Sequence, residues 1–355
     1  MKLLEQLCRT AGVPGREHRV RELVMDRIKG LFDEVRVDAM GSVLAMRKPR
    51  DKAGKLKKVA KPVRVMVAAH MDQIGFLVKH IDDKGFVRVV PVGGFDPRNL
   101  FARLVTVCPD PADPKKDLPG VMNAAGKPVH IASPEDRKKV PEVEELVIDV
   151  GLAPDDVKKK VKIGDMVVLD AAWSRIGQTA VGQCMDNRVA VWVAIRAMEK
   201  VVKQGHDAEL HIVFTVQEEV GLRGARTAAY AIKPDIGIGL DTTLCVDTPG
   251  VPDDMRTTKQ GEGVAITCAD SASIGDYDLI EQFEQIARKH KIKHQRSILA
   301  RGGTDAGTIQ AAGEGVRTMT LSCPTRYIHT VTEMVHETDL HATRDLLAAF
   351  LSEVR

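Results

Sequence analysis

The stretch VRVMVAAHMDQIGF, residues 63–76, sets two polar side chains directly after a run of apolar residues. The run VRVMVAA is apolar almost throughout, which is typical of a strand buried on both faces of a sheet. His70 and Asp72 follow it two residues apart, and so lie on the same side of an extended chain. We therefore expect a central strand that ends by offering an imidazole and a carboxylate to one site.

Helical and strand patterns alternate on either side of this strand. Residues 17–32 have apolar side chains at helical spacing, and residues 34–48 alternate like a hairpin that turns at Met40-Gly41. Further segments follow residue 184: helix 186–205, strand 209–216, helix 224–232, strand 235–240, helix 276–290, helix 303–313, strand 315–322 and helix 339–355. This alternation predicts the α/β class, with a mostly parallel sheet covered by helices.

Residues 76–180 have a different sequence pattern, in which short runs rich in β-branched residues are separated by Gly, Pro and Asp turns. This pattern indicates a small β domain of barrel or sandwich type. We therefore predict a catalytic α/β domain made of residues 1–75 and 181–355, with a β domain inserted at 76–180.

The composition excludes several classes of protein. A chain of 355 residues with a net charge of +3 has too little excess charge to indicate nucleic acid or a membrane surface as a partner. The basic run at 47–62 lacks aromatic residues and is interpreted as a solvated loop. The N-terminus does not resemble a secretory signal, and no window is long and apolar enough to span a membrane. The six cysteines are scattered, so we expect reduced thiols in a cytoplasmic protein.

Potential metal ligands follow several predicted strands or open the long helix. They are His70, Asp186, Glu218, Glu219, Asp241 and His329. Sites in open α/β sheets form beyond the carboxyl ends of the strands, so these side chains can face one cleft. Imidazoles and carboxylates are the usual ligands of a hydrolytic Zn²⁺ site, and Co²⁺ or Mn²⁺ also fits. Five ligands suit two metals about 3.5–4 Å apart that share one carboxylate.

Each candidate also has an ordinary interpretation when taken alone. His70 could be a core histidine, Asp186 a helix N-cap, and Asp241 a turn residue. Glu218 and Glu219 could be a solvated pair. The metal-site hypothesis rests on all of them falling at strand or helix ends.

Six motifs resemble, in order, those of the M42 metallo-aminopeptidases. This family includes the tetrahedral aminopeptidases, relatives of glutamyl and leucyl aminopeptidases, and members labelled endoglucanase. The motifs are HMDQIGF (70–76), CMDNR (184–188), FTVQEEVGLRGA (214–225), LDTT (240–243) with DTPG (247–250), RGGTDAG (301–307) and PTRYIHT (324–330). The resemblance covers essentially the whole chain, and it implies a sheet of the zinc-peptidase type with a small inserted β-barrel-like domain.

The resemblance implies a role for each matching position. His70 and Asp241 would bind one metal, Glu219 and His329 the other, and Asp186 would bridge the two. Both ions would be Zn or Co, with Mn as a further possibility.

Two acidic residues receive catalytic roles. The resemblance makes Glu218 the general base that takes a proton from a water between the metals. From its spacing, Asp72 could accept the hydrogen bond of the second nitrogen of His70 and so orient the imidazole.

The implied function is the removal of N-terminal residues from short peptides. Candidate substrate-binding residues are Arg301, Thr304, Asp305 and Arg326, which could equally be turn and cap residues. Alternatives are an endoglucanase-like glycosidase, an N-acyl amino acid deacylase, and a metal-binding protein without activity. By resemblance we expect a homo-oligomer built partly through the β domain, either a dimer or a tetrahedral dodecamer.

The sequence departs from the family pattern near the predicted site. Gln73 stands where the family usually has Glu, and Cys184 and Met185 precede the predicted bridging residue. A thiol at Cys184 could bind a metal or oxidise, although buried packing is the simpler interpretation. The family also implies a cis peptide bond between Asp186 and Asn187.

Overall fold

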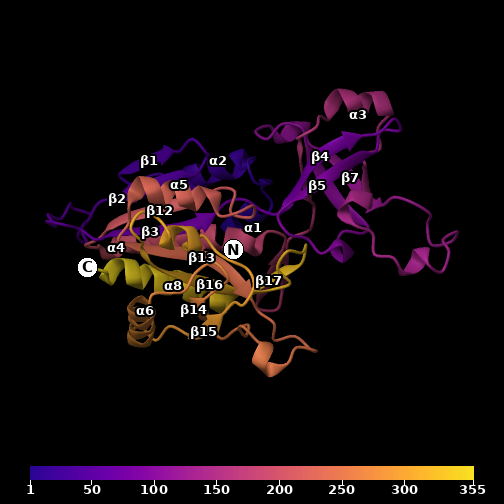
Figure 1. Cartoon of the computed structure of the whole chain (residues 1–355). Helices are drawn as coiled ribbons and strands as arrows, with labels where there is room; N and C mark the ends of the chain where they lie inside the picture. The colour runs from indigo at the N-terminus through magenta and orange to yellow at the C-terminus, as the bar shows by residue number, and fades with distance from the viewer.

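The computed structural model describes all residues, 1–355, and contains one large sheet and a separate closed barrel (Figure 1). Helices lie against the large sheet, and the barrel projects to one side of it. The predicted α/β fold with a barrel-like insertion is confirmed.

The large sheet has 11 strands in mixed orientation. Its main path is β1 (Glu34–Val37), β2 (Val43–Arg47), β12 (Glu209–Thr215), β3 (Arg64–His70), β13 (Ile236–Leu244), β16 (Arg317–Arg326), β17 (Glu333–His336), β11 (Thr179–Gly182) and β10 (Ser174–Ile176). A branch from β16 consists of β14 (Val264–Ala269) and β15 (His294–Ile298). The central strands β12, β3, β13 and β16 run parallel, whereas the outer pairs on this path are antiparallel. The sheet is therefore mixed, and the prediction of a mostly parallel sheet holds only for its centre, because the outer strands are joined by hairpins and other antiparallel pairings.

The two faces of β3 explain its continuous apolar sequence. Val65, Val67 and Ala69 pack into the main core cluster, and the alternating residues Met66 and Ala68 pack into a second cluster on the other face. Because successive side chains of a strand point to opposite faces, a strand covered on both faces must be apolar at every position.

Different helices cover the two faces. The main core includes side chains of α1 (Lys2–Cys8), α2 (His18–Arg27), α4 (Met185–Gln204), α6 (Tyr277–Lys289) and α8 (Glu337–Glu353). The second cluster includes side chains of α5 (Arg223–Ile232) and α7 (Ala306–Gln310). The predicted helices are present, but α2 ends at Arg27, well before residue 32.

The barrel consists of β4 (Gly75–Ile81), β5 (Val87–Val92), β8 (Leu146–Asp149), β7 (Leu118–Ala124), β6 (Arg103–Cys108) and β9 (Met166–Leu169), in spatial order. It has its own core of 16 buried apolar residues. The short helix α3 (Pro154–Lys160) was not predicted there. After the barrel, β10 and β11 return to the large sheet.

No helix has the length and apolarity that a membrane crossing requires. All six cysteines carry free thiols.

Candidate metal centre and active site

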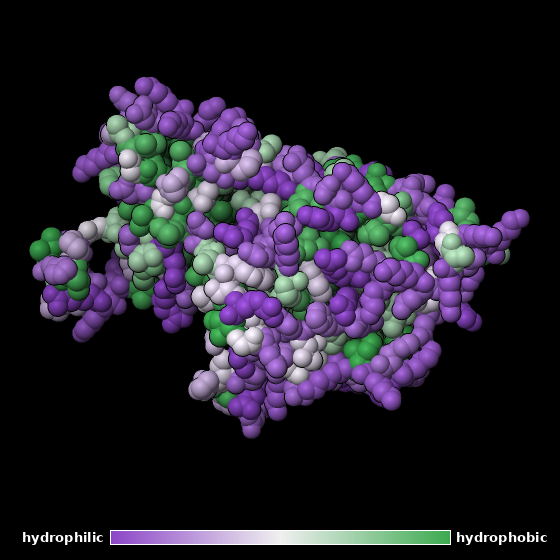
Figure 2. Space-filling model, turned by 180° about the vertical axis from the view of Figure 1, so that it is seen from behind, coloured by the Kyte–Doolittle hydropathy of each residue, from purple (hydrophilic) through white to green (hydrophobic).

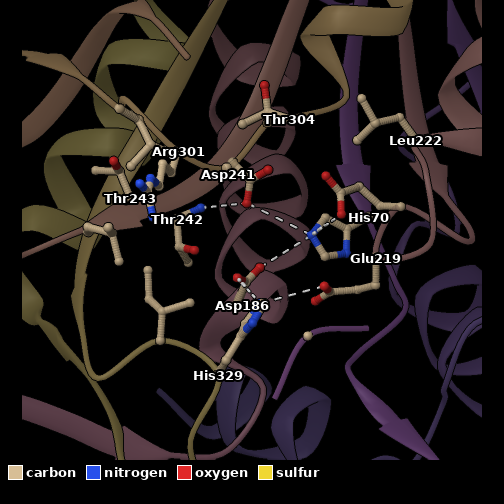
Figure 3. Close-up of a pocket in the computed structure, with 17 residues that line it drawn as sticks. His70, Asp186, Glu219, Leu222, Asp241, Thr242, Thr243, Arg301, Thr304 and His329 are labelled. Atoms are coloured by element: carbon tan, nitrogen blue, oxygen red, sulfur yellow. Dashed lines mark hydrogen bonds and ion pairs between the residues drawn. The ribbon is translucent and has the colours of Figure 1, made fainter. Parts of the chain in front are cut away.

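Five predicted metal ligands converge at the carboxyl ends of the parallel strands (Figure 3). His70 is the last residue of β3, Glu219 follows β12, and Asp241 lies near the end of β13. Asp186 is the second residue of α4, and His329 lies between β16 and β17. Parallel neighbouring strands end at the same edge, so residues remote in sequence reach one cavity.

Asp186 lies between the two imidazoles. Its Oδ1 is 3.3 Å from Nε2 of His70, and its Oδ2 is 3.5 Å from Nε2 of His329. A carboxylate with one oxygen toward each imidazole has the arrangement of a ligand shared by two cations.

The remaining carboxylates complete two groups around Asp186. Oδ1 of Asp241 and Oε2 of Glu218 each lie 3.9 Å from Nε2 of His70. On the other side, Oε2 of Glu219 lies 3.6 Å from Nε2 of His329. The donor set is of the nitrogen and oxygen type that suits Zn²⁺, Co²⁺ or Mn²⁺.

The electrostatics of the cluster favour bound positive charge. Burial, and then the neighbouring Asp186, raise the pKa of Glu219 to about 8. Burial likewise raises the pKa of Asp241 well above its ordinary value, with a further contribution from Asp186. Oε1 of Glu219 is buried and has no hydrogen-bond partner. Crowded carboxylates with an unused buried oxygen are what a cation site requires, so the residues fit the implied metals.

Asp72 acts on both His70 and the segment after β12. Nδ1 of His70 lies 3.1 Å from the backbone carbonyl oxygen of Asp72, closer than the 3.6 Å to the carboxylate. A donor role for Nδ1 leaves the lone pair of Nε2 pointing into the cavity. The carboxylate oxygens of Asp72 instead accept the N–H groups of Glu218 and Glu219, each at 3.1 Å. The side chain therefore positions the two glutamates, and the carbonyl orients the imidazole.

Unusual backbone conformations gather at the site. Gln217, Cys184 and His329 have φ values of 55°, 61° and 63°, in the left-handed region that residues other than glycine rarely adopt. The peptide bond between Asp186 and Asn187 is cis, as the family resemblance implies. The three left-handed residues lie within two positions of a predicted ligand or of Glu218, or are themselves a predicted ligand.

Two buried glutamates support the site but were not predicted. Glu333 accepts the N–H of Asp186 at 3.0 Å and that of His329 at 2.7 Å. Glu17 accepts the N–H of Gln217 at 3.2 Å, and burial, followed by the charge of Asp72, raises the pKa of Glu17 to about 7. Their sequence positions carry no signal, because the contacts with Asp186 and Gln217 join segments 147 and 200 positions apart.

The cavity has a volume of about 510 Å³ and contains two of the predicted substrate-binding residues, Arg301 and Thr304. The other two do not line it. Asp305 is buried and accepts a hydrogen bond from Thr215 at 2.5 Å. Arg326 forms a two-point ion pair with Asp247 at 2.7 and 2.8 Å. Arg301 is the only lysine or arginine among the 17 lining residues.

The residues that depart from the family pattern have structural partners. Oε1 of Gln73 accepts a hydrogen bond from the fully buried Arg188 at 3.1 Å. Cys184 is buried and is not among the residues lining the cavity, and burial raises the pKa of its thiol. This favours packing over metal binding for Cys184.

Known proteins are similar in sequence to nearly the whole chain. A sequence model described as M42 glutamyl aminopeptidase matches residues 53–346. A putative aminopeptidase of Acetivibrio thermocellus is 35% identical over 346 residues, which cover 97% of this chain and 96% of that protein.

Solved structures match equally widely. An aminopeptidase of the archaeon Desulfurococcus kamchatkensis has a TM-score of 0.91 at 36% identity, covering 99% of this chain and 94% of its own. The TET1 peptidase of Pyrococcus horikoshii, described as assembling into a tetrahedron or a large octahedral shell, has a TM-score of 0.86 at 30% identity. That match covers 99% of each chain.

Proposed function

The chain belongs to the M42 family of aminopeptidases, which are hydrolases, and from that premise we propose that it is a dinuclear metal-dependent enzyme that removes N-terminal residues from short peptides. The observation that carries the proposal is the position of Asp186, with one carboxylate oxygen toward His70 and the other toward His329.

We assign the metal ligands as two groups that share Asp186. His70 and Asp241 would hold one divalent ion, and Glu219 and His329 the other. When bound, such ions polarise the scissile carbonyl and make water more acidic. Zinc and cobalt suit the donor set, and manganese is a further choice.

Glu218 would serve as the general base. Its side chain lines the cavity, and Asp72 fixes its backbone through the hydrogen bond to the Glu218 N–H. The carboxylate would accept a proton from the attacking water and then deliver it to the leaving amine. Glu218 and Asp241 lie equally close to His70, and we assign Asp241 as the ligand, which leaves Glu218 to move a proton.

The remainder of the cavity would bind the substrate. Carboxylate oxygens of the cavity wall that the metals leave free would hold the N-terminal amine, which would restrict cleavage to the end of a peptide. Arg301 lines the cavity as a cation, and we propose that it contacts the first residue of the substrate. Thr304 also lines the cavity, but its hydroxyl bonds to Asp270 and Thr320, at 3.0 and 2.7 Å, so we propose for it a contact through the rest of the side chain.

We further propose a homo-oligomer in which the β domain, residues 76–180, makes an interface. A structural relative is described as forming a tetrahedron or an octahedral shell. Exposed apolar side chains lie on the barrel strands and on the β7–β8 connection, which extends away from the barrel in Figure 1. They are Leu104, Val121, Val129, Ile131 and Val140. Figure 2 shows green side chains on this projecting part of the molecule.

We also propose a cytoplasmic location, because free thiols at all six cysteines suit a reducing compartment. Fractionation of cells that make the protein would test this.

Hydrolysis of aminoacyl-p-nitroanilides tests the proposed reaction. We expect activity that a chelator abolishes and that added Zn²⁺ or Co²⁺ restores. Hydrolysis of cellulose that survives EDTA would instead identify a glycosidase, which uses two carboxylates without a metal. Preference for an acylated N-terminus would identify a deacylase. If the protein binds both metals but hydrolyses none of these substrates, it would be a metal-binding protein without enzymatic activity.

A further inference from the structure

Glu333 holds two segments of the metal centre at once. It is the first residue of β17 and only 2% exposed. Oε1 accepts the N–H of His329 at 2.7 Å, and Oε2 accepts the N–H of Asp186 at 3.0 Å. Each carboxylate oxygen thus holds the backbone of one residue that we assign as a metal ligand.

We propose that Glu333 is a positioning residue that fixes the separation of Asp186 and His329 and thereby sets the affinity of the cation site they share with Glu219. This inference rests on the proposed function. Glu333 does not line the cavity, and both of its oxygens are engaged by backbone amides, so it is not assigned as a ligand.

Neither of these amides belongs to a regular backbone ladder. Asp186 has non-helical backbone angles within α4, with φ −78° and ψ 105°. His329 has a φ of 63° and lies between strands. Buried N–H groups without a helix or strand partner need another acceptor, and Glu333 supplies it for both.

Pairing of β17 with a strand on each side fixes the position of Glu333. Asp186 and Glu333 are 147 positions apart in sequence, yet β17 pairs with β11, where Glu333 lies opposite Gly182. The same strand pairs with β16 through Val335 and Thr325. Glu333 is therefore held in place by the large sheet, and its hydrogen bonds hold the backbone of Asp186 and His329, where the N–H groups belong to no regular backbone ladder.

Loss of this support should weaken metal binding more than it weakens the fold. Partners that orient metal ligands typically change affinity or activity by about 10–100-fold when removed. For Glu333→Ala we expect the dissociation constant for Zn²⁺ at the site of Asp186, Glu219 and His329 to rise at least about 10-fold. Glu333→Gln keeps one acceptor oxygen and should have a smaller effect.

Asp339 offers a matched control. It is 0% exposed, and its carboxylate accepts the N–H groups of Gly261 and Gly263, each at 2.7 Å. Asp339→Ala therefore also removes a buried carboxylate with two backbone hydrogen bonds, but none of these bonds involves a proposed ligand.

The experiment measures Zn²⁺ affinity by competition with a chromophoric chelator, together with thermal unfolding of each metal-free protein. Both alanine variants should unfold at lower temperature, and only the Glu333 variant should bind Zn²⁺ more weakly. Wild-type affinity in Glu333→Ala, or equal weakening in Asp339→Ala, would overturn the proposal. If Glu333→Ala does not fold, the same comparison is made with Glu333→Gln and Asp339→Asn. Failure of the wild-type protein to bind Zn²⁺ would instead contradict the proposed function.

Discussion

Oδ1 of Asp72 accepts the backbone N–H of Glu218 at 3.1 Å, which joins the end of β3 to the segment after β12. The other oxygen accepts the N–H of Glu219 at the same distance. Asp72, two residues after the proposed ligand His70, therefore fixes the backbone of Glu218, the proposed base, and of Glu219, a proposed ligand. β3 and β12 are parallel neighbours in the sheet, so this connection is short and buried.

Asp72→Asn should reduce turnover, because an amide group can replace only one of the two acceptor oxygens. We expect kcat to fall by roughly 10–100-fold, the range typical for partners that orient a metal site. Steady-state kinetics on a leucyl anilide, with circular dichroism to verify folding, makes the test. Unchanged kcat in the folded variant would show that Asp72 does not position Glu218.

Arg301 should favour substrates with an acidic first residue, because a guanidinium pairs well with a carboxylate. We expect Arg301→Gln to lower kcat/KM for a glutamyl anilide by about 10-fold or more, while the leucyl anilide changes little. The leucyl substrate serves as the internal control. An equal loss on both substrates would mean that Arg301 supports the cavity without selecting the first residue.

The exposed apolar residues of the β7–β8 connection should support assembly. Ile131 and Val129 are 69% and 60% exposed, so Ile131→Asp with Val129→Asp should leave the stability of the subunit within about 0.5 kcal/mol. We expect the mass measured by light scattering to fall. Tyr230→Asp, at a side chain 77% exposed on α5, is the control and should not alter the mass. An unchanged mass in the double variant would exclude this connection as an interface.

The ion pair of Arg326 and Asp247 should make stability depend on pH. The hydrogen bond that Asp247 accepts from Arg326 is the main reason that the pKa of Asp247 lies below the ordinary value of 3.8. The stabilisation is therefore present above pH 3.8 and is lost as the pH falls toward the lower folded-state pKa. Arg326→Leu should lower the free energy of unfolding by about 1–3 kcal/mol at pH 7, and by less at about pH 3.

Urea unfolding at both pH values makes this measurement. Arg98→Leu is the control, since Arg98 forms an exposed ion pair with Asp96 and should contribute little at either pH. A loss for Arg326→Leu that does not shrink at acid pH would assign the effect to packing.

The strands and ligands of the centre were the part most open to prediction from the sequence. β3 has apolar residues at every buried position because both faces are covered, and His70 ends that run. Asp186 could be predicted because it opens the long apolar helix α4. These signals are local, so the chain itself reveals them.

Other features depend on contacts between distant segments and leave no local pattern. Glu333 is an ordinary acidic residue until β17 is placed beside β11. Asp305 was predicted to contact substrate, but its side chain is buried, bonds to Thr215 and does not line the cavity. Arg326 was also predicted to contact substrate. It is instead the last residue of β16, and its side chain pairs with Asp247. The strands β14, β15 and β17 were also missed. β15 (HQRSI) and β17 (EMVH) are short and rich in polar residues, so they lack a strand pattern, whereas β14 (VAITCA) has an apolar run that could have been recognised.

The most direct test of the metal-dependent mechanism is the Glu218→Gln variant, measured for both metal content and turnover. The substitution keeps the size of the side chain but removes its capacity to accept a proton at neutral pH. We expect two divalent ions per chain, as in the wild type, and a fall in kcat of about 100-fold or more on aminoacyl anilides. Turnover near the wild-type rate with both ions bound would contradict the assignment of Glu218 as the base.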